Sequence, residues 1–136
     1  MRAFVPVAFL CLGCATAGEP KPTQYNYVNM TDHLLRVEIA GVTPNASPGM
    51  VNPHTGSSRL RRVEKEYQRE ILVADAIEIT WTKNRGDQKN HALLRREGLG
   101  LPARLSGGKL EFTYTAQETW EVKYYQNWKP PPPTGY

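Results

Sequence analysis

Period-two alternation of apolar and polar residues constrains the fold of this chain more than any other feature of its sequence. It runs through four ranges, which are 33–41, 76–83, 108–116 and 119–126. In the second range, Ile77, Ile79 and Trp81 alternate with polar residues. Because successive side chains of a strand point to opposite faces, each range predicts a β-strand with one apolar face. Antiparallel sheets that cover a core on one side have this pattern.

Two further ranges, 24–30 and 91–97, are weaker strand candidates. Strands of this kind bury their apolar faces most simply as two packed sheets. We therefore expect an all-β fold, a small antiparallel β-sandwich of the immunoglobulin or transthyretin type. Between 57 and 72, in contrast, apolar residues recur at helical spacing, and we favour a short crossover helix there over an irregular strand.

Polar turn residues separate the expected strands. Thr31-Asp32 predicts a tight hairpin between the first two strands, and the range 115–118 predicts another between the last two. The polar stretch 84–87 joins the middle strands. The range 43–58 is a loop that is long enough to carry function.

The N-terminus has the three parts of a secretory signal peptide. Arg2 is the only charged residue before Glu19, an apolar run covers 3–12, and small residues follow it. The run is shorter than the roughly 20 apolar residues that a transmembrane helix needs. We therefore expect export of the protein, with residues 1–17 as its signal peptide.

Two cleavage sites compete at the end of this signal. The small residues at 15–17 suit an ordinary signal peptidase, which would release a chain that begins at Gly18. The range 12–14 resembles the lipobox of bacterial lipoproteins, in which the enzyme cuts before an acylated cysteine. We favour lipidation of Cys14, because the apolar run ends at this cysteine without a polar spacer. Ala15 would then direct the protein to the outer membrane by the lipoprotein sorting rule.

One folded domain is expected between two proline-containing segments. Residues 18–23 would form a tether, 24–128 the sandwich and 129–136 a proline-rich tail, whose four consecutive prolines lack the N–H donors of a strand. Cys11 and Cys14 are the only cysteines and lie in the signal region, so the folded part has no internal disulfide. Its stability must come from a packed core.

The sequence contains no motif for catalysis, for a metal or for nucleic acid. No serine lies in a nucleophile elbow, and the three histidines lack the spacing of metal ligands. The formal net charge of +4 is a mild excess, and charges of both signs are interspersed, as in RRVEKEYQRE at 61–70. We therefore expect no enzyme, no cofactor, no metal and no nucleic-acid partner.

Aromatic residues at the end of the last strand are the main candidates for binding a partner. Tyr124, Tyr125 and Trp128 lie close together there, and at most one of the two adjacent tyrosines can face the core. Exposed aromatic residues anchor protein interfaces; the alternative is that Tyr125 and Trp128 fold back over a sheet edge. Arg85 in a turn and His54 in the long loop are further candidates, because loops often carry function.

Three stretches carry a resemblance to a known family. They are YNYVNMTDHLLRVEIAG, ADAIEITWT and LSGGKLEFTYTAQETWEVKYY, within residues 25–125. In this order they resemble a family of small proteobacterial lipoproteins of unknown function. Genes of that family often lie beside type VI secretion genes, near phospholipase effectors, and some relatives look like immunity proteins. This chain departs from the family pattern at Val28 and Met30, and it lacks the cysteines common in the middle loop of relatives.

The resemblance implies a periplasmic immunity lipoprotein, anchored to the outer membrane, that binds and neutralises a lipase-type effector of type VI secretion. It supplies no established binding residues. The alternative is a structural or assembly lipoprotein of the cell envelope that reaches its partner through the proline-rich tail. Deletion of residues 129–136 separates these two functions, because only the second requires the tail.

Overall fold

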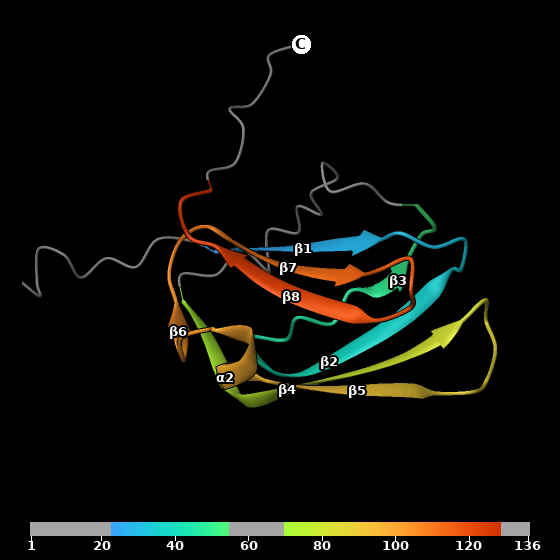
Figure 1. Cartoon of the computed structure of the whole chain (residues 1–136), viewed down its shortest axis with the longest axis horizontal. Helices are drawn as coiled ribbons and strands as arrows, with labels where there is room; N and C mark the ends of the chain where they lie inside the picture. The colour runs from blue at the N-terminus through green and yellow to red at the C-terminus, as the bar shows by residue number, and fades with distance from the viewer. Residues whose placement is uncertain (1–22, 55–69, 129–136) are drawn as a thin grey trace, which may run out of the picture.

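The computed structural model describes residues 23–54 and 70–128 and places them in two facing β-sheets (Figure 1). The smaller sheet has the strand order β1 (Gln24–Asn29), β7 (Lys109–Tyr114) and β8 (Trp120–Tyr125). The larger sheet contains β2 (Leu35–Thr43), β3 (Gly49–Val51), β4 (Ile71–Lys83), β5 (Asn90–Arg95) and β6 (Arg104–Leu105). Its order is β3-β2-β4-β5, and β6 pairs with the first residues of β4. The described strands form a sandwich and no closed barrel, so the expected fold class is confirmed.

The domain begins close to its expected start. The expected signal peptide, the tail at 129–136 and all of the expected tether except Thr23 lie outside the described residues. Thr23 is buried, and its hydroxyl donates a hydrogen bond to the carbonyl of Gly107 at 3.2 Å. Among the helices that the structure does describe, none is both long and apolar enough to span a bilayer.

The helical elements differ from those expected. Most of the expected helix at 57–72 lies outside the described residues, and its last two residues belong to β4 instead. A short helix, α2 (Arg96–Leu99), lies where a strand was expected to end. β5 stops at Arg95, and Gly100 ends the helix in the left-handed conformation, with φ of 69°. Glycine adopts this conformation without steric strain, which explains the position of the helix end.

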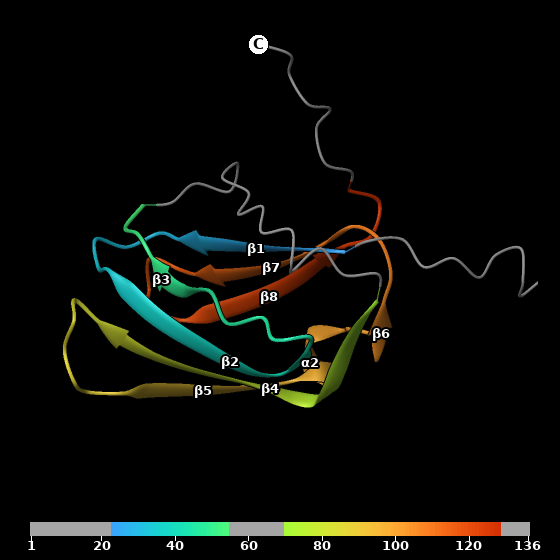
Figure 2. The ribbon, with the colours of Figure 1, turned by 180° about the vertical axis from the view of Figure 1, so that it is seen from behind.

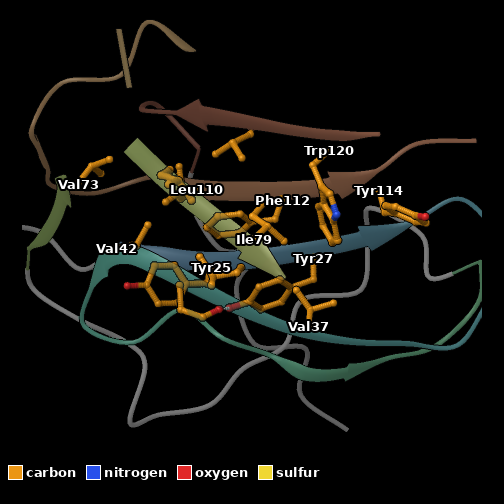
Figure 3. Close-up of a cluster of buried hydrophobic side chains, with 14 of the residues drawn as sticks. Tyr25, Tyr27, Val37, Val42, Val73, Ile79, Leu110, Phe112, Tyr114 and Trp120 are labelled. Atoms are coloured by element: carbon orange, nitrogen blue, oxygen red, sulfur yellow. Dashed lines mark hydrogen bonds between the residues drawn. The ribbon is translucent and has the colours of Figure 1, made fainter. Parts of the chain in front are cut away.

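The four alternating ranges form β2, β4, β7 and β8, with turns at 84–87 and 115–118 as expected. The alternating apolar side chains of these ranges point between the sheets and form the core (Figure 3). Trp81 of β4 and Phe112 of β7 come from opposite sheets and are 8% and 0% exposed. Their inward orientation agrees with the register that the alternation predicts.

The link between β1 and β2 is a crossing between sheets, so the hairpin expected at Thr31-Asp32 is wrong. Asn29 is fully buried and shapes the crossing. Its side-chain oxygen accepts hydrogen bonds from the N–H and the hydroxyl of Thr31, at 3.0 and 2.7 Å, and its amide donates to the His33 carbonyl at 2.7 Å. Because a buried amide needs such partners, the chain turns toward the larger sheet. β1 then pairs with β7 in parallel, where an antiparallel pair was expected.

The loop after β2 is tied to the core by tyrosines of the other sheet. The hydroxyl of Tyr25 donates to the Pro44 carbonyl at 2.6 Å, and that of Tyr27 donates to the Ala46 carbonyl. Both rings also pack against Phe112, with centroid separations of 6.3 and 5.6 Å. The first part of this loop therefore contributes to the packing of the sandwich. Figure 2 shows the loop running from β2 to β3 across the back of the molecule.

Candidate functional site

The aromatic candidates on β8 have different environments. Tyr124 packs against the core, with its hydroxyl 3.0 and 2.8 Å from the carbonyl oxygens of Ser106 and Gly107. Burial raises the pKa of this phenol, and the hydrogen bond to Ser106 opposes the shift. Tyr125 faces outward and is 40% exposed. One of the two adjacent tyrosines therefore faces the core and the other faces solvent.

Tyr125 and Trp128 flank the side chain of Lys109, the first residue of β7. The Lys109 ammonium lies 5.0 Å from the centre of the Tyr125 ring and 5.4 Å from that of the Trp128 ring, which is cation–π range. It also lies 3.2 Å from a carboxylate oxygen of Glu111, which accepts a hydrogen bond from the Asn26 amide at 3.2 Å. Lys109, Glu111, Tyr125 and Trp128 are called the Lys109 cluster below. Trp128 thus folds back over the sheet, while Tyr125 keeps an exposed ring.

A close backbone contact positions the Lys109 cluster. Gly108 has a φ of 75°, and a Cβ atom there would lie 2.1 Å from the carbonyl oxygen of Tyr125. Only glycine permits this approach. Since Lys109 is paired directly with Tyr125 across the two strands, the contact brings the end of β8 beside the start of β7.

Arg85 and His54 are not part of this cluster. The β4–β5 turn, which contains Arg85, lies at the end of the sandwich where β8 begins, whereas the Lys109 cluster lies where β8 ends (Figure 1). The ring of His54 contacts the Asp32 carboxylate. The backbone N–H of His54 donates a hydrogen bond to the Thr31 carbonyl at 3.1 Å. Of the five residues that the sequence singled out, the structure therefore brings Tyr125 and Trp128 together around Lys109 and leaves Arg85 and His54 apart from them.

The turn that carries Arg85 is tightly held. Asn84 and Arg85 have φ of 53° and 63°, and the Gly86 N–H donates to the Lys83 carbonyl at 2.8 Å, as in a type I′ turn. Asn84 and Leu34 are joined by two hydrogen bonds. The backbone N–H of Asn84 donates to the Leu34 carbonyl at 2.7 Å, and the side-chain oxygen of Asn84 accepts from the backbone N–H of Leu34 at 2.9 Å. The tip is thereby fixed to the link between β1 and β2. Arg85 lines an open hollow on the outer face of the larger sheet.

Glu118, which the sequence did not single out, links three segments at the same end of the sandwich. Its carboxylate accepts hydrogen bonds from Lys83 at 2.8 Å and from the Tyr114 hydroxyl at 3.0 Å, and it lies 3.6 Å from His33. The bonds from Lys83 and Tyr114 hold the pKa of Glu118 below its usual value. Burial is the main reason that the pKa of Tyr114 rises to about 12. No spacing in the sequence connects these residues, and only the fold brings them together.

The three histidines have separate partners. His33 lies beside Glu118, His54 beside Asp32, and the His91 ring nitrogen is 3.4 Å from the Thr80 hydroxyl. In the part of the chain that the structure describes, no group of three or more histidine, cysteine, aspartate or glutamate side chains is placed to hold a metal ion.

Comparisons with known proteins assign no family to the chain. No protein-family model matches it, and neither the curated proteins nor the solved structures contain a significant match. The resemblance to proteobacterial lipoproteins therefore stays a prediction.

Proposed function

We propose that this protein is an exported binding protein of the cell envelope, and specifically a periplasmic immunity lipoprotein that neutralises a lipase-type effector of type VI secretion. The observation that carries the proposal is the Lys109 cluster, in which two aromatic rings flank a lysine on a paired sheet. The signal peptide supports export, Cys14 supports an outer-membrane anchor, and the family resemblance supports the class of partner.

The Lys109 cluster has the chemistry of an interface hot spot. Tyrosine and tryptophan are the residues whose truncation most often weakens protein complexes. The side chains of Lys109 and Glu111 are each only 12% exposed, so their charges are largely desolvated before a partner binds. Strand pairing and the Gly108 contact already fix the backbone here, and the contacts with Lys109 orient the rings of Tyr125 and Trp128. Binding would therefore cost little additional side-chain entropy.

An immunity protein of this type acts by covering a surface of its partner. In this arrangement the exposed ring of Tyr125 would be buried in the partner, and its hydroxyl would find a hydrogen-bond partner there. A lipid anchor at Cys14 would hold the domain beside the membrane on which a lipase acts. Inhibition by occlusion needs no catalytic group on this chain.

The proposal predicts that a lipase-type effector is encoded beside this gene, and the test makes that effector in the periplasm with and without the mature protein. We expect the wild-type protein to bind the purified effector and to protect the cells. Tyr125→Ala and Trp128→Ala should each weaken binding by at least about 2 kcal/mol, which is roughly 30-fold, if they are hot spots. Circular dichroism melts would verify that each variant is folded.

Leu93→Ala is the matched control, because Leu93 is 60% exposed on the larger sheet, away from the Lys109 cluster. It should keep wild-type affinity. Unchanged affinity in the Tyr125 and Trp128 variants would show that the effector binds another surface of the protein. Failure of the wild-type protein to bind the effector and to protect cells would overturn the proposed function.

A further inference from the structure

A second surface lies on the outer face of the larger sheet and takes no part in the function proposed above. An open hollow of about 390 Å³ lies there beside the β4–β5 turn, a size in the range of ligand pockets. Arg36 of β2 pairs with Met50 of β3 on one side and with Thr82 of β4 on the other. Directly opposed residues in paired strands share a face, so these three side chains form a row along the hollow.

Positive charge predominates around this hollow. Arg36, Arg85 and Lys89 line it, with Asp87 as the single acidic residue. None of the three cations forms an ion pair with another residue in the described ranges. Like charges that surround a concave surface repel one another and concentrate anions from solution. An anion in the hollow would remove this repulsion.

The position of Arg85 is strained and fixed. Its φ of 63° is in the left-handed region, where glycine is the relaxed residue. Such outliers persist where the surrounding structure holds them, and they gather at functional sites. Here the hydrogen bonds between Asn84 and Leu34 hold the turn, so the arginine is presented beside the hollow by a rigid tip.

We propose that this hollow binds a phosphate ester group carried on an apolar chain. Arg36 and Arg85 offer planar guanidinium groups that match phosphate oxygens, and Lys89 adds a compact charge. A phosphate monoester carries more negative charge than a carboxylate and so matches three cations better. Leu34 and Met50 line the same hollow, and Met50 is 37% exposed, so they would contact the chain that bears the phosphate.

The test titrates the full-length mature protein with dihexanoyl phosphatidic acid, a soluble short-chain phosphate ester, by calorimetry. We expect saturable binding that weakens as salt is added. Arg36→Gln and Arg85→Gln should each weaken it about tenfold or more, because each removes a charge-assisted hydrogen bond. Arg95→Gln is the matched control: Arg95 is exposed on the same face of the sheet, at the far end of β5, and its loss should leave affinity unchanged.

Two vesicle experiments distinguish a phosphate group on a membrane lipid from one on a soluble phosphate ester. Vesicles of phosphatidylcholine with phosphatidic acid are compared with vesicles of phosphatidylcholine alone, which give the background from any lipid anchor. Binding to the anionic vesicles that requires Arg36 would assign the site to a lipid headgroup. Binding of the short-chain ester without this vesicle binding would assign it to a soluble phosphate ester. If the wild-type protein fails to bind the short-chain ester, or if Arg95→Gln weakens binding as much as Arg36→Gln, the proposal is wrong.

Discussion

The indole nitrogen of Trp81 donates a hydrogen bond to the phenolic oxygen of Tyr114 at 3.3 Å, and this bond joins the two sheets inside the core. The two rings also pack edge to face, with their centroids 5.6 Å apart. The Tyr114 hydroxyl donates in turn to the Glu118 carboxylate at 3.0 Å. A chain of hydrogen bonds thus runs from the space between the sheets to the β7–β8 turn at the end of the sandwich.

Tyr114→Phe tests the bond between the sheets. The substitution keeps the ring but removes the acceptor, which leaves a buried N–H of Trp81 without a partner. We expect a loss of about 1–3 kcal/mol in the free energy of unfolding, measured in urea. Tyr125→Phe, which removes an outward-facing hydroxyl, should cost less than about 0.5 kcal/mol. Equal midpoints for wild type and Tyr114→Phe would show that the bond does not contribute.

Acid should weaken the contacts of Glu118. Lys83 and Tyr114 hold the pKa of this carboxyl below its usual value of 4.5, so near and below that pH the folded state binds fewer protons than the unfolded state. The stabilisation is therefore complete above pH 4.5 and is lost as the pH falls through the folded-state pKa. Urea melts of wild type and Glu118→Gln should differ at neutral pH and converge in acid. A difference that is constant with pH would contradict this role.

Core truncations should be severe in both sheets. Trp81→Ala and Phe112→Ala remove side chains that are 8% and 0% exposed, and each should cost about 3–5 kcal/mol. Lys83→Ala is unsuited as a surface control, because Lys83 binds Glu118 at 2.8 Å. Lys123→Ala on β8 is suitable, since that side chain is 64% exposed, and it should cost less than about 0.5 kcal/mol. Equal losses at Phe112 and Lys123 in urea melts would contradict the register.

The strands were predictable because each carries its own signal. The alternation around Ile79 and Phe112 specifies which side chains turn inward, whatever their partner strand. The partner of β1 was not predictable, because the crossing depends on the buried Asn29 and on carbonyl groups of residues 33, 51 and 52. An asparagine two residues before a Thr-Asp pair is equally compatible with a hairpin turn.

The candidate sites were predictable only in part, because they depend on contacts between distant segments. Tyr125 and Trp128 were predicted because they are aromatic residues near the end of a strand. Their contact with Lys109 needs the β7–β8 register, and the hollow beside Arg85 needs β2, β3 and β4 together. Such sites have no local spacing that a sequence pattern could reveal.

Gly41→Ala should destabilise the larger sheet. Gly41 lies where the register between β2 and β4 shifts, with φ of 95°, and a Cβ atom there would lie 2.3 Å from the Ala76 carbonyl oxygen. Strain and the clash together should cost at least about 2 kcal/mol in urea melts. Gly98→Ala within α2 is the control. A Cβ atom there meets no atom within 4 Å, and alanine favours helix, so we expect a change of less than about 1 kcal/mol, toward greater stability. Similar losses for both variants would contradict the close approach at Gly41.

Cys14 decides whether the proposed immunity function operates from a membrane. This residue lies outside the described part of the chain, so the prediction rests on the sequence alone. We expect the mature protein to begin at Cys14, to carry the added mass of acyl chains and to fractionate with outer membranes. Cys14→Ala should abolish the added mass and release or stall the protein, whereas Cys11→Ala should be processed normally. Mass spectrometry of the mature N-terminus distinguishes the outcomes. If the mature chain begins at Gly18 and Cys14→Ala does not change its processing, the protein has no lipid anchor at Cys14. The domain would then reach its partner by diffusion through the periplasm.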